Sequence, residues 1–123
     1  MADEITLTIP RDPDFLRVAH LVIGGLAVRL NLTIENLEDM QIAVDAVLAE
    51  SEVDDDVTMT LCLRNQELET TLSPVDGHVR ARFEHEDAGD AALGLRRVLG
   101  TVVDDVAFEG DTVRLRKKVR VGG

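Results

Sequence analysis

Aromatic residues are nearly absent from this chain. They make up 2% of its 123 residues, and Trp and Tyr do not occur at all. Hydrophobic residues still account for 45% of the sequence, so a core can form, and it must be built from aliphatic side chains. The same scarcity argues against a platform for single-stranded nucleic acid, because such surfaces stack bases on exposed rings.

Cysteine and basic residues are also scarce. The single cysteine, Cys62, excludes an internal disulfide and favours a reducing compartment. It lies in Thr58–Leu63, whose alternation is typical of a strand, where a small apolar thiol is ordinary. The net charge of −11 gives an acidic surface that repels phosphate groups. We therefore expect neither nucleic acid nor an anionic membrane as a partner.

Long hydrophobic runs are missing as well. The apolar stretch Val18–Leu30 contains His20 and Arg29 and is too short to span a bilayer. The N-terminus is acidic and shows no signal peptide. These features predict a cytoplasmic protein, and 123 residues suit a single domain over residues 1–123.

The charge is uneven along the chain. The last 13 residues hold one acidic and five basic residues, a local charge of +4, so the rest carries −15. Two interpretations are open for this basic final strand. It meets an acidic partner or phosphate, or it is an edge strand whose charges discourage aggregation.

The spacing of apolar residues predicts five strands and three helices. The strands fall at residues 5–9, 57–64, 67–72, 106–108 and 112–119, and the helices at about 12–30, 33–49 and 91–103. Residues 79–83 read as a short strand or as part of a mobile segment, and 84–90 as a loop. This order predicts an α+β fold, a two-layer sandwich whose mixed, mostly antiparallel sheet carries the helices on one face.

The helix at 12–30 has two unusual properties. It is apolar on more than one face, so it is either deeply buried or shared with another chain, which makes a homodimer one hypothesis. Gly24 and Gly25 in its middle each cost roughly 1 kcal/mol relative to Ala. The pair predicts either close approach of another backbone or a kink.

Three segments, in this order of elements, carry a resemblance to a known family. They are Ile9-Pro10 with Phe15–Ala19, Leu37–Ala46, and Ala92–Val106. Together they resemble the GHKL (Bergerat-fold) ATPase domain, over nearly the whole chain. The most similar branch is that of the anti-sigma factors and serine-protein kinases of bacterial partner-switching systems.

The resemblance implies phosphoryl transfer from ATP, with the motif E-x-x-x-N on one helix. A spacing of four residues places the carboxylate and the Mg²⁺-binding asparagine on one helical face. The corresponding residues here are Asp45, a catalytic candidate, and Ala49, which has no oxygen to offer Mg²⁺. Glu50 points about 100° around the helix and is a poor substitute.

The other two nucleotide-binding motifs of the family are matched only in part. Asp76-Gly77 matches the adenine-reading Asp and one glycine, and the alternative is a plain Asp-Gly turn. Gly94 keeps one glycine of a phosphate-facing G-x-G-L turn, and the alternative is a glycine inside an amphipathic helix. Between these motifs lies a short lid with four acidic residues that would repel phosphate: Glu84, Glu86, Asp87 and Asp90.

These features predict an anti-sigma-factor-like regulator that binds a sigma factor or an anti-sigma antagonist and whose ATP site is weakened or lost. No resident cofactor is expected, with ATP and Mg²⁺ as the ligands to test. No metal site is expected, since His78 and His85 lack helical or Cys partners. The alternative is an active ATP-dependent serine-protein kinase that phosphorylates an anti-anti-sigma partner.

Overall fold

The computed structural model describes residues 3–10, 12–30, 32–51, 56–84 and 94–119. Within these ranges nine elements follow one another: β1 (Asp3–Ile9), α1 (Pro13–Arg29), α2 (Ile34–Glu50), β2 (Val57–Arg64), β3 (Glu67–Ser73), α3 (Gly77–Glu84), α4 (Leu95–Val102), β4 (Asp105–Glu109) and β5 (Thr112–Lys118).

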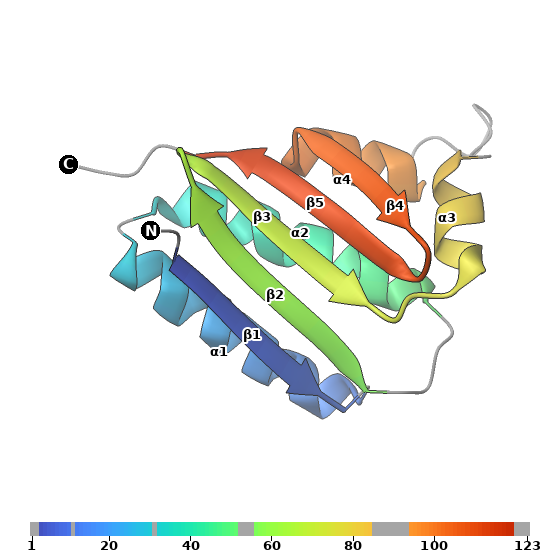
Figure 1. Ribbon diagram of the computed structural model, residues 1–123, viewed down its shortest axis with the longest axis horizontal. Helices are drawn as coiled ribbons and strands as arrows, with labels where there is room; N and C mark the ends of the chain where they lie inside the picture. The colour runs from blue at the N-terminus through green and yellow to red at the C-terminus, as the bar shows by residue number, and fades with distance from the viewer. Residues whose placement is uncertain (1–2, 11, 31, 52–55, 85–93, 120–123) are drawn as a thin grey trace.

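The strands form one sheet in the order β1-β2-β3-β5-β4, and the helices cover one of its faces (Figure 1). The predicted two-layer α+β sandwich is therefore confirmed. The sequence predicted a mixed, mostly antiparallel sheet, and every described strand pair is antiparallel.

Strict alternation along the strands builds the core. Ile5 and Leu7 of β1 lie opposite Leu61 and Met59 of β2, all on the helix side of the sheet. The intervening threonines lie on the open side, where Thr8 and Thr58 are joined by a hydrogen bond of 2.9 Å. Because side chains alternate with a period of two, this register buries the aliphatic half of each strand.

Local signals place the starts of α1 and α2 where the sequence predicts them. The Thr33 side chain accepts a hydrogen bond from the backbone N–H of Asn36 at 3.1 Å and caps α2. The Asp12 side chain accepts one from the N–H of Asp14 at 2.9 Å, at the start of α1. The predicted connection at Asn65-Gln66 is a tight hairpin turn, with φ of 54° and 62° at the two residues.

Three predictions change. Residues 79–83 are neither strand nor mobile segment, because they lie in the helix α3. The helix predicted at 91–103 is described from Leu95 to Val102, and residues 91–93 lie outside the described part. The basic strand β5 is not an edge strand, since β3 and β4 flank it, and the edges of the sheet are β1 and β4.

The glycine pair of α1 is explained neither by a break nor by crowding. The helix runs unbroken from Pro13 to Arg29. A Cβ atom added to Gly24 or Gly25 would meet nothing within 4 Å. The predicted close approach of another backbone is therefore not made by the described residues of this chain.

Candidate functional site

The helix α2 carries the predicted chemistry on its outer side. Its inner side is packed on the sheet, with Met40, Ala43, Val44 and Val47 at 0% exposure. Asp45 is half-exposed, and Ala49, one turn later, is exposed. The predicted pair therefore lies on the solvent side of the helix layer, as the helical spacing requires.

Asp45 has a partner that the sequence did not indicate. The Nε2 atom of His20, on α1, lies 2.8 Å from Oδ1 of Asp45, and both side chains are partly exposed. Because a carboxylate only accepts, Nε2 carries the proton and donates it in this hydrogen bond. The backbone carbonyl of His20 also accepts a hydrogen bond from Gln41 Nε2 at 3.4 Å. The carboxylate of Asp45 is thus held at the joint between α1 and α2.

Glu50 contacts the helix α3. Its Oε2 atom lies 3.6 Å from His78 Nε2 and 3.9 Å from Arg82 Nε, both on α3. Glu50 therefore joins the end of α2 to α3. That Glu50 is a poor substitute for a Mg²⁺-binding asparagine stays a prediction.

Asp76 acts as the helix cap of α3. Its Oδ1 atom and its backbone carbonyl both accept from the N–H of Val79, at 3.4 and 3.2 Å. Gly77 is the first residue of α3 and is exposed. The Asp-Gly pair thus starts a helix, a use of Asp that needs no ligand. Whether Asp76 also reads adenine remains a prediction.

Gly94 stands at the start of a helix. It is the N-cap of α4, in an extended conformation with φ −70° and ψ 148°, and no side chain caps the helix there. The plain-helix interpretation placed Gly94 in the interior of a helix, whereas the structure places it just before the first helical residue. The residues at the start of α4 include basic side chains. The guanidinium of Arg96 lies 5.4 Å from the ring centre of Phe83.

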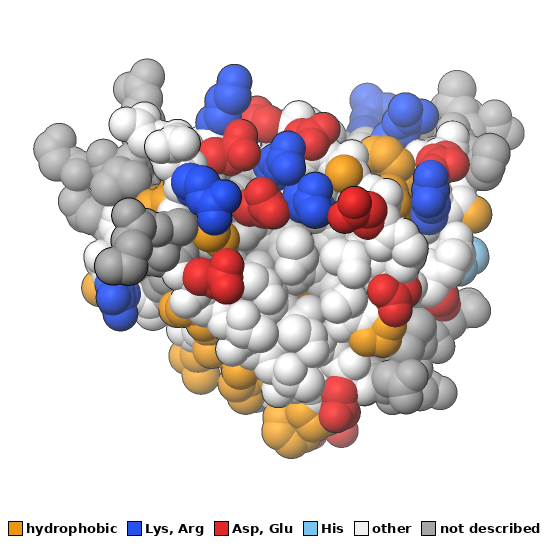
Figure 2. Space-filling view, in the orientation of Figure 1, with side chains coloured by type: hydrophobic (Ala, Val, Ile, Leu, Met, Phe, Trp, Pro, Cys, Tyr) orange, Lys and Arg blue, Asp and Glu red, His pale blue; other side chains and the backbone are white. Residues whose placement is uncertain are grey.

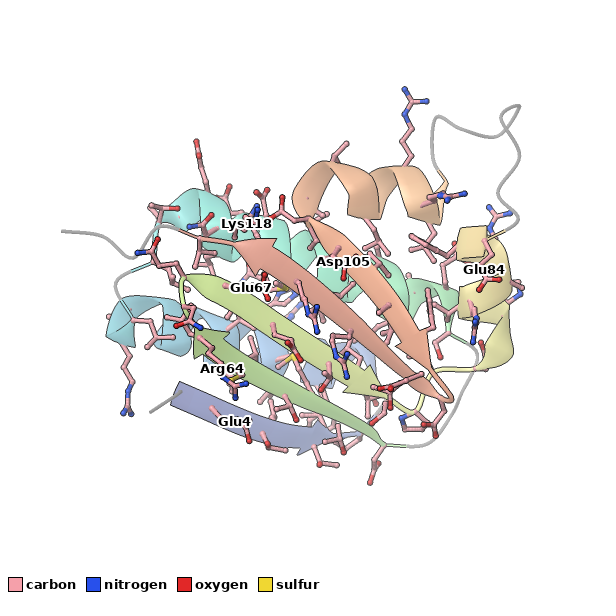
Figure 3. All side chains as sticks on the ribbon, turned by 45° about the horizontal axis from the view of Figure 1, so that its top comes forward. Glu4, Arg64, Glu67, Glu84, Asp105 and Lys118 are labelled. Atoms are coloured by element: carbon pink, nitrogen blue, oxygen red, sulfur yellow. The ribbon has the colours of Figure 1, made fainter. Side chains whose placement is uncertain are left out.

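The helix α3, which precedes the predicted lid, contacts the sheet through its last turn. The ring of Phe83 lies 5.5 Å from that of Phe108 on β4, in a tilted arrangement. Glu84, predicted as part of the acidic lid, is the last residue of α3 and accepts from Arg80 Nε at 2.6 Å. Figure 3 shows it on α3, apart from the sheet. The other lid residues, Glu86, Asp87 and Asp90, lie outside the described residues, as does His85.

Two arginines of β5 form ion pairs with carboxylates of the neighbouring strands. Arg116 lies 3.3 Å from Glu69 of β3, and Arg114 lies 3.2 Å from the same residue and 3.1 Å from Glu109 of β4. Figure 2 shows the resulting mixture of both signs over one part of the open face, beside an uncharged zone. The two arginines of the basic strand are thus balanced by carboxylates of the same sheet.

A shallow hollow of about 570 Å³ lies on this open face. Its lining includes Glu4, Cys62, Arg64, Glu69 and Arg116, of which Figure 3 labels Glu4 and Arg64. Cys62 accepts from the guanidinium of Arg64 at 3.9 Å. The hollow is on the face away from the helices, and no residue predicted for the nucleotide site lines it.

Within the described ranges, no three His, Cys, Asp or Glu side chains are grouped so that they could hold a metal ion. No helix in the same ranges has the length and apolar character needed to cross a membrane.

Comparison with known proteins assigns the chain to a family. No family model matches it. Serine-protein kinase RsbW of Listeria monocytogenes is 30% identical to this chain over an alignment length of 140. The alignment covers 97% of this chain and 89% of the relative. The protein of the same name from Listeria innocua matches to the same extent. The chain belongs to the RsbW serine-protein kinase family. The resemblance to the anti-sigma-factor and serine-kinase branch is thereby confirmed at the level of the family.

The structure brings only part of the predicted site together. The helix α2 contacts both α3 and α4, so the helices that carry Asp45, Gly77 and Gly94 share one layer. Within that layer the Asp45 carboxylate is bonded to α1, whereas α3 is contacted by Glu50. Sequence reasoning missed His20, because a partner 25 residues away leaves no local signal.

Proposed function

We propose that this RsbW-family protein is an anti-sigma-factor-like regulator of a bacterial partner-switching system, and that it acts in the cytoplasm by binding proteins. In this proposal its ATP site is weakened or lost, and neither ATP nor a metal ion is a resident cofactor. The partner is a sigma factor or an anti-sigma antagonist.

One observation carries the loss of nucleotide chemistry. Ala49 is exposed on the outer side of α2, one turn after Asp45, and a methyl group gives Mg²⁺ no oxygen. The nearest carboxylate along the chain, that of Glu50, is directed to His78 and Arg82. Mg²⁺ that bridges phosphates needs fixed oxygen ligands, so nucleotide binding should be weak.

The alternative is an active ATP-dependent serine-protein kinase. Three observations favour it. The relatives are named serine-protein kinases, and Asp45 keeps a half-exposed carboxylate that could accept a proton from a serine hydroxyl. In addition, α3 and the first turn of α4 hold four arginines against one glutamate, a local excess of positive charge in a chain of −11.

Restoring the missing ligand tests the choice. Ala49→Asn should increase the affinity for Mg·ATP at least about tenfold over the wild type, since it returns an oxygen ligand at an exposed position. Ala49→Gln is the matched control, because its amide is one methylene further from the helix. Titration calorimetry with and without Mg²⁺ reads out both. Tight, magnesium-dependent binding to the wild type, with transfer of the γ-phosphoryl group to a partner serine, would establish the kinase instead.

Direct binding tests the proposed partner. Sigma factors of the source organism, purified one at a time, should include one that forms a stable complex without nucleotide. Absence of binding to every one of them would refute the anti-sigma role, whatever the result with ATP.

We also propose that the protein forms a homodimer along β1. This strand is a free edge of the sheet, with seven residues and no proline or lysine to block pairing. Phe15 and Val18 at the start of α1 are 42% and 38% exposed. Thr6→Pro should convert a dimer seen by sedimentation into a monomer, because proline removes a backbone donor, whereas Thr6→Val should not.

A further inference from the structure

Two oppositely charged side chains on the open face of the sheet form no ion pair within the described part of the chain. They are Glu4 near the start of β1 and Arg64 at the end of β2, and both are exposed. Among the described side chains, the guanidinium of Arg64 has a polar contact only with the sulfur atom of Cys62, at 3.9 Å. Glu4 and Arg64 both line the hollow of about 570 Å³, a volume within the range of small-molecule sites. Opposite charges that share a concave surface without pairing are complementary to a ligand that carries both signs.

Glu67 is a second carboxylate of this hollow that can accept a cation. It is the first residue of β3 and lies opposite Arg64 in the strand register. Its Oε1 atom lies 3.9 Å from Arg116 Nε, whereas Glu69 lies 3.3 Å from the same nitrogen atom. Arg116 is therefore held more closely by Glu69. The Glu67 carboxylate, whose two oxygen atoms are both acceptors, has capacity for a further cation.

Carboxylates outnumber guanidinium groups around the hollow. Its lining has three glutamates and two arginines, a formal charge of −1. Asp105 of β4 brings one more carboxylate to 3.9 Å from Arg116. A ligand with one carboxylate and two cationic groups would neutralise the lining, and a basic α-amino acid such as lysine has these charges at neutral pH. The hydroxyl groups of Thr60 and Thr71 line the same hollow, so the surface between the charges is polar as well.

The strand register assigns each charge of the ligand to one side chain. Arg64 lies on β2 between the two glutamates, which Figure 3 labels on β1 and β3. Arg64 and Glu67 are directly paired, so their Cβ atoms are about 5 Å apart. Glu4 is opposite Cys62, so it lies about 7–8 Å from Arg64 on the diagonal. In an α-amino acid the carboxylate and the ammonium group share one carbon atom, while the side-chain cation is further away. The carboxylate therefore suits Arg64, the α-ammonium group suits Glu67, and the side-chain cation suits Glu4.

We propose that this hollow binds a free basic α-amino acid through Arg64, Glu67 and Glu4. The three side chains are partly exposed, so each ion pair is weak and the expected affinity is millimolar. The hollow is on the face away from the helices, and no residue predicted for the nucleotide site lines it. The proposal is therefore independent of the anti-sigma role and of nucleotide binding, and its failure would leave both unchanged.

The first experiment uses the wild-type protein and L-lysine. Cys62 is the only cysteine and lines the hollow, so the rate at which a maleimide alkylates it reports occupancy. We expect lysine to slow this reaction in a saturable way, relative to sodium chloride at the same ionic strength. Three analogues each lack one charge: cadaverine lacks the carboxylate, Nα-acetyl-lysine the α-ammonium group, and norleucine the side-chain cation. Each should bind about fivefold more weakly than lysine, the effect of losing one partly exposed ion pair.

Single substitutions assign each charge of the ligand. Arg64→Met should remove the preference for lysine over cadaverine, Glu67→Gln the preference over Nα-acetyl-lysine, and Glu4→Gln the preference over norleucine. Glu35→Gln on α2 and Arg17→Met on α1 are the matched controls. They remove exposed charges from the helix layer and should leave all three preferences intact.

Four results would overturn the proposal. Lysine that does not slow alkylation of the wild type would exclude occupancy of the hollow. Equal affinities for lysine and norleucine, or for lysine and cadaverine, would show that the hollow does not distinguish these charges. Control variants that lose as much affinity as Glu4→Gln and Arg64→Met would indicate a general effect of surface charge. Tighter binding of Nα-acetyl-lysine than of lysine would assign the hollow to the C-terminal lysine of a polypeptide instead of a free amino acid.

Discussion

The ion pair between Asp39 and Lys117 predicts an unequal response to the loss of either partner. Lys117 Nζ lies 3.0 Å from Asp39 Oδ2, with the lysine side chain 14% and the aspartate 33% exposed. Lys117 is opposite Leu68 in the sheet register, on the side that faces the helices. Asp39→Asn leaves a mostly buried ammonium group without its carboxylate. Lys117→Met removes the charge and keeps an apolar side chain of similar length.

The two costs differ in size for a physical reason. Removing one partner of a fully buried ion pair costs about 3–5 kcal/mol, whereas apolar replacement of such a pair is often neutral. The aspartate here is one-third exposed, so water compensates part of the loss. We expect Asp39→Asn to lower the free energy of unfolding by about 1–3 kcal/mol, and Lys117→Met to change it by less than about 1 kcal/mol. The double variant should recover most of the loss caused by Asp39→Asn.

Urea unfolding followed by far-UV circular dichroism measures these differences, since the chain has no Trp for fluorescence. Glu84→Gln serves as the control, because it breaks an exposed pair with Arg80 four residues away and should cost no more than about 0.5 kcal/mol. Equal losses for Asp39→Asn and Lys117→Met, or a double variant as unstable as Asp39→Asn, would refute the reasoning.

Three other substitutions test single features of the fold by the same unfolding measurement. Thr33→Ala removes the cap of α2 and should cost about 1 kcal/mol, whereas Thr33→Ser should not. Leu99→Ala creates a cavity at a fully buried position of α4 and should cost about 2–5 kcal/mol; a smaller loss would mean that the core collapses around the site. Gln66→Gly should stabilise the protein by about 1 kcal/mol, since φ of 62° strains a residue with a Cβ, and a destabilised variant would contradict that account.

Regular alternation and explicit end signals made most of the fold predictable. β2 and β3 were predicted almost to the residue, because their hydrophobic period of two is interrupted only at the turn. α2 was predicted because Thr33 caps it and its apolar stripe is long. α3 was missed because its eight residues include only two large apolar side chains, Val79 and Phe83, and their spacing of four fits a strand as well as a helix. The position of β5 inside the sheet was missed because its order depends on long-range pairing.

The candidate site was predictable only where motifs are local. Asp45, Ala49 and Gly94 could be placed from their neighbours in sequence, and the structure puts Gly94 at the N-cap of α4. The contacts that decide their chemistry were not predictable. His20 meets Asp45 and Glu50 meets His78 only because α1 and α3 pack on opposite sides of α2.

The central place of β5 affects how the chain can be synthesised. β3 pairs with β5 from Glu67–Lys118 to Leu72–Val113, so the paired residues are 51 to 41 positions apart in the sequence. Until the last hairpin leaves the ribosome, the hydrogen-bonding edge of β3 stays open, with Leu68 and Leu72 on its core side. A nascent chain at that stage resembles an unfinished sheet, the kind of species that associates with other strands. Its success in folding should therefore depend on the speed with which residues 105–118 are completed and docked.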